Sequence, residues 1–290
     1  MRTAIVTDSN SGITQSEAEN LGIFVLPMPF LVDGETFYED VNLTQEQFYE
    51  KLKSGANVST SQPIVGELLK FWDEILKTHD DLVYIPMSSG LSGACETAKM
   101  LAEDYKGKVQ VVDNQRISVT LRQSVMDAIT LKDKGMPAGK IKKRLEETKF
   151  DASIYISLST LKYLKKGGRI TPAAAAVGTV LHLRPVLQIQ GEKLDKYRAT
   201  TVTVKQAKAA MIEGLRNDLF IRFKDLTETG KMSIAIAHTH NEEKAEEFKK
   251  ELSEIFPDLP ITFCNPLSLS VACHIGPGAL ACVCTRIEKK

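Results

Sequence analysis

The chain has 290 residues, of which 43% are hydrophobic and 26% are charged. This composition supports at least one full hydrophobic core and excludes the disordered, collagen-like and low-complexity classes. Lys plus Arg and Asp plus Glu both number 37, so no positive surplus is available to neutralise a phosphate backbone, and we expect no nucleic-acid partner.

Neither the start of the chain nor its most apolar run is typical of a secreted or membrane protein. The first ten residues pass directly into a strand-like run, whereas a secretory signal places a longer apolar stretch behind its basic end. The run from Ala173 to Leu183 is much shorter than the roughly 20 residues that span a bilayer. We therefore expect a cytoplasmic protein without an integral membrane segment.

The first half of the chain is predicted to alternate strands with helices. In chain order we expect a strand at 3–8, a helix at 15–21, a strand at 23–32, a helix at 43–55, a helix from Pro63 to Leu76, a strand at 82–87, a helix at 91–105, a strand at 108–113 and a Lys-rich helical region at 131–149. Thr44 and Gln47 have the spacing of a capping box. Such alternation predicts a parallel sheet with helices on both faces.

The pattern changes near residue 150, where we place a domain boundary. The later elements are predicted as a strand at 153–158, a short helix at 161–168, a hairpin at 185–202 that turns near Gly191 and Glu192, a helix at 204–217, a strand at 232–238, a helix at 242–256, and strands near 261–265 and 279–285. A hairpin is foreign to a purely parallel sheet. The sequence thus predicts an α/β fold of two domains: residues 1–150 as a doubly wound parallel sheet, and residues 151–290 as a mixed sheet with helices.

The cysteines and histidines predict neither a disulfide framework nor a metal site. Five cysteines are an odd number, and no CxxC occurs among them. Cys282 and Cys284 alternate on one strand face, so we interpret them as packed thiols. His238 and His240 share a strand face but lack a third ligand at the usual zinc spacing.

Three polar segments stand at predicted element boundaries in the first half: residues 8–9 after the first strand, residues 59–63 before the helix that contains Trp72, and residues 88–93 between the strand at 82–87 and its helix. Ligands of doubly wound sheets bind beyond the carboxyl ends of the strands, where helix N-termini favour negative charge. We expect Thr60 and Ser92 to face the same small volume, because both stand where helix N-termini should meet at the carboxyl edge of one sheet. Each Ser or Thr, taken singly, also fits a plain helix N-cap.

Other motifs leave their chemistry open. The serine-rich loop has no GK[ST] ending, and Ala94 occupies the position where a G-x-S-x-G elbow needs glycine. His274 stands in a glycine-proline loop and fits either a ligand contact or a structural hydrogen bond. Arg169 follows a helix end and fits either a functional arginine or part of a cationic C-cap. The small and apolar residues at 173–181 fit close helix packing or the wall of a narrow apolar channel.

Taken together and in order, these segments resemble the DegV family, which includes the fatty-acid-binding subunit of bacterial fatty acid kinase. The matching segments are TDSNSG at 7–12, STSQP at 59–63, MSSGLSGACETA at 87–98, VVDN at 111–114, LKYLKKGGRI at 161–170, RPVLQIQGEKLDKYR at 184–198 and HIGPGAL at 274–280. Each motif alone is weak, but the ordered set covers the chain from end to end.

The resemblance implies a carrier that holds one long-chain fatty acid, such as palmitate, in a tunnel between its two domains. No other cofactor and no catalytic residue are implied. By this resemblance Thr60 and Ser92 bind the carboxylate and His274 contacts it, and we group Ser61 and Gly93 with them.

The resemblance also implies that the carboxylate is presented to a separate ATP-dependent kinase for acyl-phosphate formation. Arg169 matches the family arginine associated with the head group and the kinase partner, and we assign Arg198 of the hairpin to the same region. The sequence departs from the family pattern at Ala94, where threonine is usual, and at Asn114, where serine is frequent.

Two alternatives stay open. A serine-dependent hydrolase or transferase would use Ser92 as nucleophile and His274 as base. A binding protein for another amphiphile would use the same polar loops. We expect His274 to orient a ligand by hydrogen bonding, because an imidazole can donate to a carboxylate whether it is neutral or charged.

Overall fold

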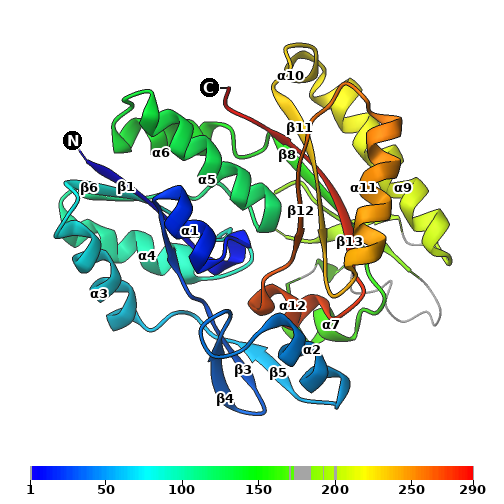
Figure 1. The fold of residues 1–290 in the computed structure, drawn as a ribbon, viewed down its shortest axis with the longest axis horizontal. Coiled ribbons are helices and arrows are strands. Elements are labelled where there is room, and N and C mark those ends of the chain that lie inside the picture. The colour runs from blue at the N-terminus through cyan, green and yellow to red at the C-terminus, as the bar shows by residue number, and fades with distance from the viewer. Residues whose placement is uncertain (1, 170, 173–183, 192, 199–200, 290) are drawn as a thin grey trace. The chain divides into compact units, whose positions relative to one another are not determined.

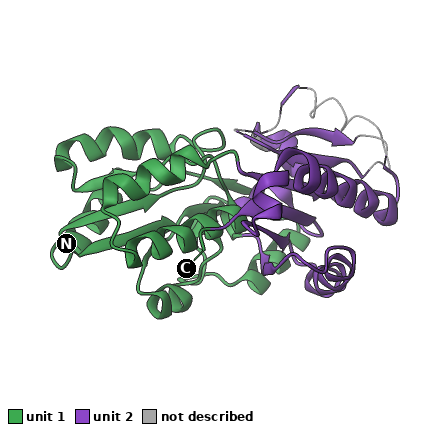
Figure 2. Ribbon diagram, turned by 90° about the horizontal axis from the view of Figure 1, so that it is seen from above, with its two compact units in different colours: residues 1–150, 268–270, 288–290 green, residues 151–267, 271–287 purple. Residues whose placement is uncertain are grey.

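The computed structural model describes residues 2–169, 171–172, 184–191, 193–198 and 201–289 (Figure 1). The chain forms two compact units (Figure 2). Unit 1 comprises Met1–Phe150, Ser268–Ser270 and Glu288–Lys290, and unit 2 comprises Asp151–Leu267 and Val271–Ile287.

The main sheet of unit 1 has four parallel strands in the order β2-β1-β6-β7. Their bounds are Phe24–Leu26 for β2, Thr3–Asp8 for β1, Asp81–Ile85 for β6 and Val109–Val111 for β7. The chain moves from β1 to β2 on one side and later returns to β6 on the other. The topological switch point therefore lies between β1 and β6, the place where open α/β sheets bind ligands.

Helices cover both faces of this sheet. One core cluster joins the strands to α1 (Gln15–Leu21), α5 (Ser118–Asp133) and α6 (Ala138–Glu147). A second cluster joins them to α3 (Val65–Leu76) and α4 (Ala94–Ala102), with Trp72 fully buried among them. The predicted doubly wound parallel sheet is confirmed.

A second sheet of unit 1 was not predicted. The apolar run 23–32 divides into β2 and β3 (Pro29–Val32), and β3 joins an antiparallel sheet with β4 (Glu35–Tyr38) and β5 (Val58–Thr60). Pro27 lies at the break, and proline has no N–H to donate to a strand ladder. One continuous strand at 23–32 was therefore wrong.

Two helix predictions in unit 1 also need correction. Helix α3 begins at Val65 and not at Pro63, because Ile64 keeps an extended backbone at φ −65° and ψ 128°. Helix α5 starts at Ser118, well before the predicted helical region. Its sequence lacks a clear apolar stripe, because polar side chains such as Arg122 and Gln123 are buried along the helix. In contrast, α2 (Gln45–Lys53) has the predicted capping box of Thr44 and Gln47.

Unit 2 contains a six-stranded mixed sheet in the order β10-β9-β8-β13-β11-β12. The bounds are Asp195–Arg198 for β10, Val186–Ile189 for β9, Ala152–Ser157 for β8, Leu280–Arg286 for β13, Met232–His238 for β11 and Ile261–Pro266 for β12. Among these strands only β11 and β12 pair in parallel. The predicted mixed sheet is confirmed, including the hairpin of β9 and β10.

The helices of unit 2 include α7 (Lys162–Gly167), α9 (Val204–Asn217), α11 (Glu242–Ile255) and α12 (Leu269–Ile275). The first two residues of α12 belong to unit 1. Helices α9 and α11 pack on the sheet over a core that includes Cys282 and Cys284. All five cysteines are free thiols.

Helix α9 approaches the sheet so closely at Gly214 that this position requires glycine. Tyr155 on β8 donates a 2.7 Å hydrogen bond to Asp218 and lies against Gly214 of α9. A Cβ atom at Gly214 would be 2.6 Å from the Tyr155 ring, which real packing does not allow. The helix can therefore reach this distance only with glycine at that position.

We expect Gly214→Ala to lower the free energy of unfolding by about 1–3 kcal/mol, because the added methyl group forces the buried tyrosine to shift. Gly139→Ala is the matched control, since no atom lies within 4 Å of a Cβ at this position in helix α6. That control should raise stability by about 0.5–1 kcal/mol through helix propensity. Urea denaturation measures both; equal effects of the two substitutions would contradict the close approach.

Candidate functional site

A buried carboxylate joins the two loops at the switch point of unit 1. Asp8 ends β1 and is fully buried, and its oxygens accept backbone N–H groups of Asn10 and Met87, both at 2.9 Å. Asn10 lies in the loop after β1 and Met87 in the loop after β6. Burial raises the pKa of Asp8 to about 6, against the lowering effect of these hydrogen bonds. Asp8 thus holds the two loops at a fixed distance.

The loop after β6 is organised by its own serines. The Ser88 carbonyl accepts the N–H groups of Leu91 and Ser92, both at 3.1 Å, and the Ser88 hydroxyl accepts that of Gly90 at 3.2 Å. Ser92 is half-buried, and its hydroxyl oxygen accepts the Ala94 N–H at 3.2 Å. No acceptor for the Ser92 hydroxyl proton is found among the described residues. Ser92 therefore acts as a local cap and keeps its proton available for a ligand.

The loop at 59–63 lies against the start of α4. Gln62 accepts a 3.3 Å hydrogen bond from the Thr97 hydroxyl, and a Cβ at Gly93 would be only 2.5 Å from the Gln62 side-chain nitrogen. The polar segments 59–63 and 88–93 are thus neighbours in unit 1. Thr60 is half-buried, whereas Ser61 and Gly93 are exposed.

The expected reason for this proximity, a shared sheet edge, was wrong. Thr60 is the last residue of β5 and pairs with Phe30 in the three-stranded antiparallel sheet. Ser92 follows β6, a strand of the parallel sheet. The loops meet through the Gln62 side chain and not along the edge of one sheet. That the two hydroxyls face one small volume stays a prediction.

Asn10 is a site neighbour that the sequence analysis did not select. Its side-chain oxygen accepts the Ser270 hydroxyl at 2.5 Å and the Ser268 hydroxyl at 3.4 Å, while its buried side-chain nitrogen has no partner among the described residues. Glu39 also holds this segment, since its carboxylate accepts the Leu269 N–H at 2.7 Å. A contact across some 260 positions leaves no signal in sequence spacing.

Asn114, one of the departures from the family pattern, is 1% exposed. Neither atom of its side-chain amide has a hydrogen-bond partner among the described residues. The structure gives no physical account of this amide.

In unit 2 the structure brings together two residues that the sequence selected separately. His274 lies near the end of α12 and is close enough to Arg169 for the guanidinium to affect its titration. Burial, assisted by that positive charge, lowers the His274 pKa to about 4. The imidazole is therefore neutral at physiological pH and is a weak base. This favours the expected orienting role over the catalytic role.

The loop after His274 is held from two sides. Thr239 donates a 2.6 Å hydrogen bond to the Gly276 carbonyl, and its hydroxyl oxygen accepts the Ala279 N–H at 2.9 Å. Gly276 has φ +74°, and a Cβ there would be 2.3 Å from the Tyr163 ring. Both the backbone angle and the close approach require glycine at this position.

Arg198 has a local partner. Its guanidinium forms a 2.8 Å ion pair with Glu213 of α9, and the Arg198 side chain is 44% exposed. A solvated pair of this kind adds little stability and does not by itself indicate a docking surface. The assignment of Arg198 to a partner region stays a prediction.

One group of potential metal ligands occurs among the described residues: Cys95, Glu96 and Asp113. Lys99 already forms ion pairs with both carboxylates, at 2.9 Å from Glu96 and 3.0 Å from Asp113. Burial raises the pKa of the Cys95 thiol to about 12, and a protonated thiol is a poor ligand. The group therefore gives no support to a metal site.

Within the described part of the chain, no helix combines the length and apolar character needed to cross a bilayer. The predicted apolar run at 173–183 lies outside the described residues.

Comparison with known proteins identifies relatives along the whole chain. A family model described as "Uncharacterised protein, DegV family" matches residues 2–286. The Protein DegV of Bacillus subtilis (strain 168) is 30% identical over 290 residues, covering 98% of this chain and 99% of that protein.

Solved structures agree with this similarity. The crystal structure of DegV, a fatty acid binding protein from Bacillus subtilis, has a TM-score of 0.85 and 28% identity, with 99% of this chain and all of that chain covered. A structure described as fatty acid binding of a DegV family protein from Thermus thermophilus has a TM-score of 0.86 and 27% identity, with the same coverage.

The buried carboxylate of Asp8 should give a defined pH dependence. Its folded pKa of about 6 exceeds the reference value of 3.8, so the folded state binds the proton more tightly. The contribution of Asp8 to stability therefore falls as pH rises from about 4 to 6, by about 3 kcal/mol, and is constant at higher pH.

Asp8→Asn removes this titration and should be compared with the unchanged chain. The free energy of unfolding of the unchanged chain should fall relative to that of Asp8→Asn between pH about 4 and 6, as measured by urea denaturation at each pH. The difference between the two proteins would be independent of pH if Asp8 ionised normally in the folded state.

Proposed function

Because the chain belongs to the DegV family, we propose that it binds one long-chain fatty acid and holds the carboxylate at the polar loops of unit 1. The observation that carries this proposal is the full-length similarity to a Bacillus subtilis protein described as fatty acid binding. In the proposal, Thr60 and Ser92 donate hydrogen bonds to the carboxylate, with Ser61 and Gly93 beside them and His274 as a further contact.

The local chemistry of Ser92 supports this role. Its hydroxyl proton is available, and the residue lies at the N-terminal end of α4, where the helix dipole favours a negative charge. The loop is held by Asp8 before any ligand arrives, so little ordering is required on binding. That the acid lies between the two units remains a prediction of the family resemblance.

The energetics assign different tasks to the two ends of the ligand. Burying about 14 methylene groups at roughly 0.8 kcal/mol each gives a gross gain near 11 kcal/mol, before the cost of association. Charge-assisted hydrogen bonds of about 1.5–3 kcal/mol each must first recover the desolvation of the carboxylate. The acyl chain therefore supplies most of the affinity, and the polar loops fix the orientation.

A finer part of the proposal is that the bound carboxylate is presented to a separate ATP-dependent kinase. The sequence has no GK[ST] phosphate loop to bind ATP itself. Arg169 is half-buried beside His274, and we assign it to the presented head group or the docking of the kinase. In this scheme the chain is a lipid-binding subunit that catalyses no reaction, and it resides in the cytoplasm.

Thr60→Ala and Ser92→Ala should each weaken palmitate binding by at least about tenfold, because each removes one charge-assisted donor. Ser54→Ala is the control, since it removes an exposed hydroxyl at the end of α2 that bonds only to Glu50 among the described residues. Native mass spectrometry and fluorescence competition measure retained lipid.

The same proteins test the hydrolase alternative. A carrier shows no sustained turnover of acyl esters, whereas turnover that disappears in both Ser92→Ala and His274→Ala would overturn the carrier proposal. Unchanged palmitate affinity in Thr60→Ala and Ser92→Ala would remove the site assignment while leaving lipid binding intact.

For the kinase step, Arg169→Ala should reduce acyl-phosphate formation by about tenfold while changing palmitate affinity by less than about twofold. Arg216→Ala provides the matched loss of an exposed arginine on α9. Formation of acyl phosphate is followed in the presence of ATP and the kinase subunit from the same host. Equal losses of phosphorylation and of lipid binding would instead assign Arg169 to the fatty-acid site.

A further inference from the structure

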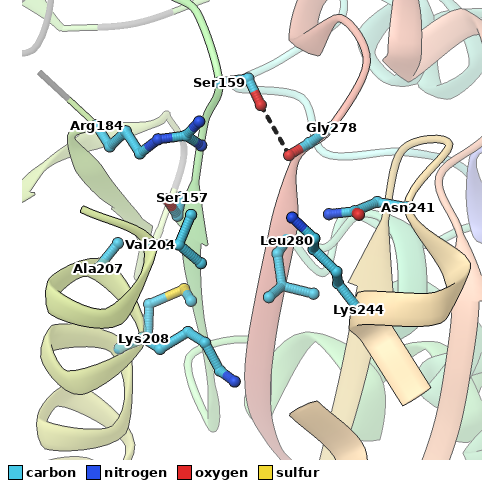
Figure 3. A pocket seen from close by; sticks show the side chains of 11 residues that line it. Ser157, Ser159, Arg184, Val204, Ala207, Lys208, Asn241, Lys244, Gly278 and Leu280 are labelled. Carbon is cyan, nitrogen blue, oxygen red and sulfur yellow. Dashed lines mark hydrogen bonds between the residues drawn. The ribbon is translucent and has the colours of Figure 1, made fainter. Parts of the chain in front are cut away.

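A small polar cavity of about 130 Å³ lies within unit 2, and its lining contains none of the site residues predicted from the sequence. It opens between α9, α11 and the strands β8 and β13, and its lining includes Ser157, Arg184, Lys208, Asn241 and Lys244 (Figure 3). The volume admits several waters but is below the roughly 300–1,000 Å³ of typical small-molecule pockets. A long acyl chain therefore does not fit this cavity.

The cavity carries a positive charge of about two. Three basic side chains line it, and no carboxylate is among the described lining residues. Lys208 is neutralised by an ion pair with Glu251, whereas no ion pair involves the side chain of Arg184 or Lys244 in the described part of the chain. Figure 3 shows the Arg184 guanidinium and the Lys244 ammonium reaching into the cavity from opposite sides.

The polar side chains of Ser157 and Asn241 also line the cavity. Ser157 is 8% exposed and lines the cavity from β8, and its hydroxyl has no hydrogen-bond partner among the described residues. Asn241 is the N-cap residue of α11, but its side chain makes no capping hydrogen bond. The first turn of this 14-residue helix therefore keeps N–H groups that favour an anion.

The position of Arg184 is fixed by its backbone. The Arg184 N–H donates to the Thr201 carbonyl at 2.8 Å, and the Thr201 hydroxyl donates to the Arg184 carbonyl. These two hydrogen bonds hold the Arg184 backbone in place before any ligand binds, which reduces the entropy cost of binding. The nearest acidic residues of α11, Glu242 and Glu243, are exposed and do not line the cavity.

We propose that this cavity binds a phosphate group, either as inorganic phosphate or as the phosphate monoester of a small molecule. A phosphate monoester carries a charge of about −1.5 to −2 near pH 7, which matches the two cations that have no ion pair with a described carboxylate. The planar guanidinium of Arg184 suits two phosphate oxygens, and Ser157 and Asn241 offer donors to the others. A monocarboxylate would leave one positive charge without a partner.

Calorimetric titration of the intact chain tests this proposal, with inorganic phosphate and glycerol phosphate as probes at constant ionic strength. We expect saturable binding, and acetate should bind at least about tenfold more weakly. Binding of both probes identifies a site open to monoesters, and binding of inorganic phosphate alone identifies a site for the free ion. No saturable binding of either probe would overturn the proposal.

Variants separate a built site from general attraction between charges. Arg184→Gln/Lys244→Gln should weaken inorganic phosphate binding by at least about tenfold, and Ser157→Ala, which changes no charge, by about threefold. The control is Lys205→Gln/Lys250→Gln, which removes two positive charges from exposed lysines of α9 and α11 that do not line the cavity. Equal losses in the two double variants, or no loss in the first, would overturn the proposal. Circular dichroism confirms that each variant is folded.

Discussion

The buried carboxylate of Asp8 is the interaction on which the polar end of unit 1 depends. A carboxyl group without solvent is costly to ionise, and two backbone N–H groups at 2.9 Å offset only part of that cost. Those two donors belong to loops that follow different strands, β1 and β6. The same contact that stabilises the charge therefore fixes both loops at the switch point, and the position of Ser92 depends on it.

The two units carry different electrostatic environments. In unit 1 the proposed carboxylate-binding residues Thr60, Ser61, Ser92 and Gly93 offer only neutral hydroxyl and backbone donors. Unit 2 has Arg169 beside a neutral imidazole and, separately, Arg184 and Lys244 at a polar cavity. Neutral donors suit a single carboxylate whose affinity comes from its acyl chain, whereas paired cations suit a dianion with little apolar surface.

Elements with regular local signals were predicted well from the sequence. The capping box at Thr44 depends on residues within one turn of each other, and α9 has the predicted bounds of 204–217. Elements that depend on distant partners were not. Helix α5 buries Arg122 because that side chain pairs with Glu17, more than a hundred positions away, at 2.6 Å. The division of the run 23–32 into two sheets depends likewise on which strands lie beside it.

Local patterns in the chain were enough to establish the alternation of strands and helices, the change to a mixed sheet in the second half and the polar loops, because these features arise from periodicity, capping and turn chemistry. Three contacts became visible only in the folded chain: Gln62 against Gly93, Asn10 with the hydroxyls of Ser268 and Ser270, and Arg169 near His274. The cavity between α9 and α11 likewise exists only in the folded chain. Such contacts are set by the packing of segments far apart in the chain, and residue spacing carries no record of that packing.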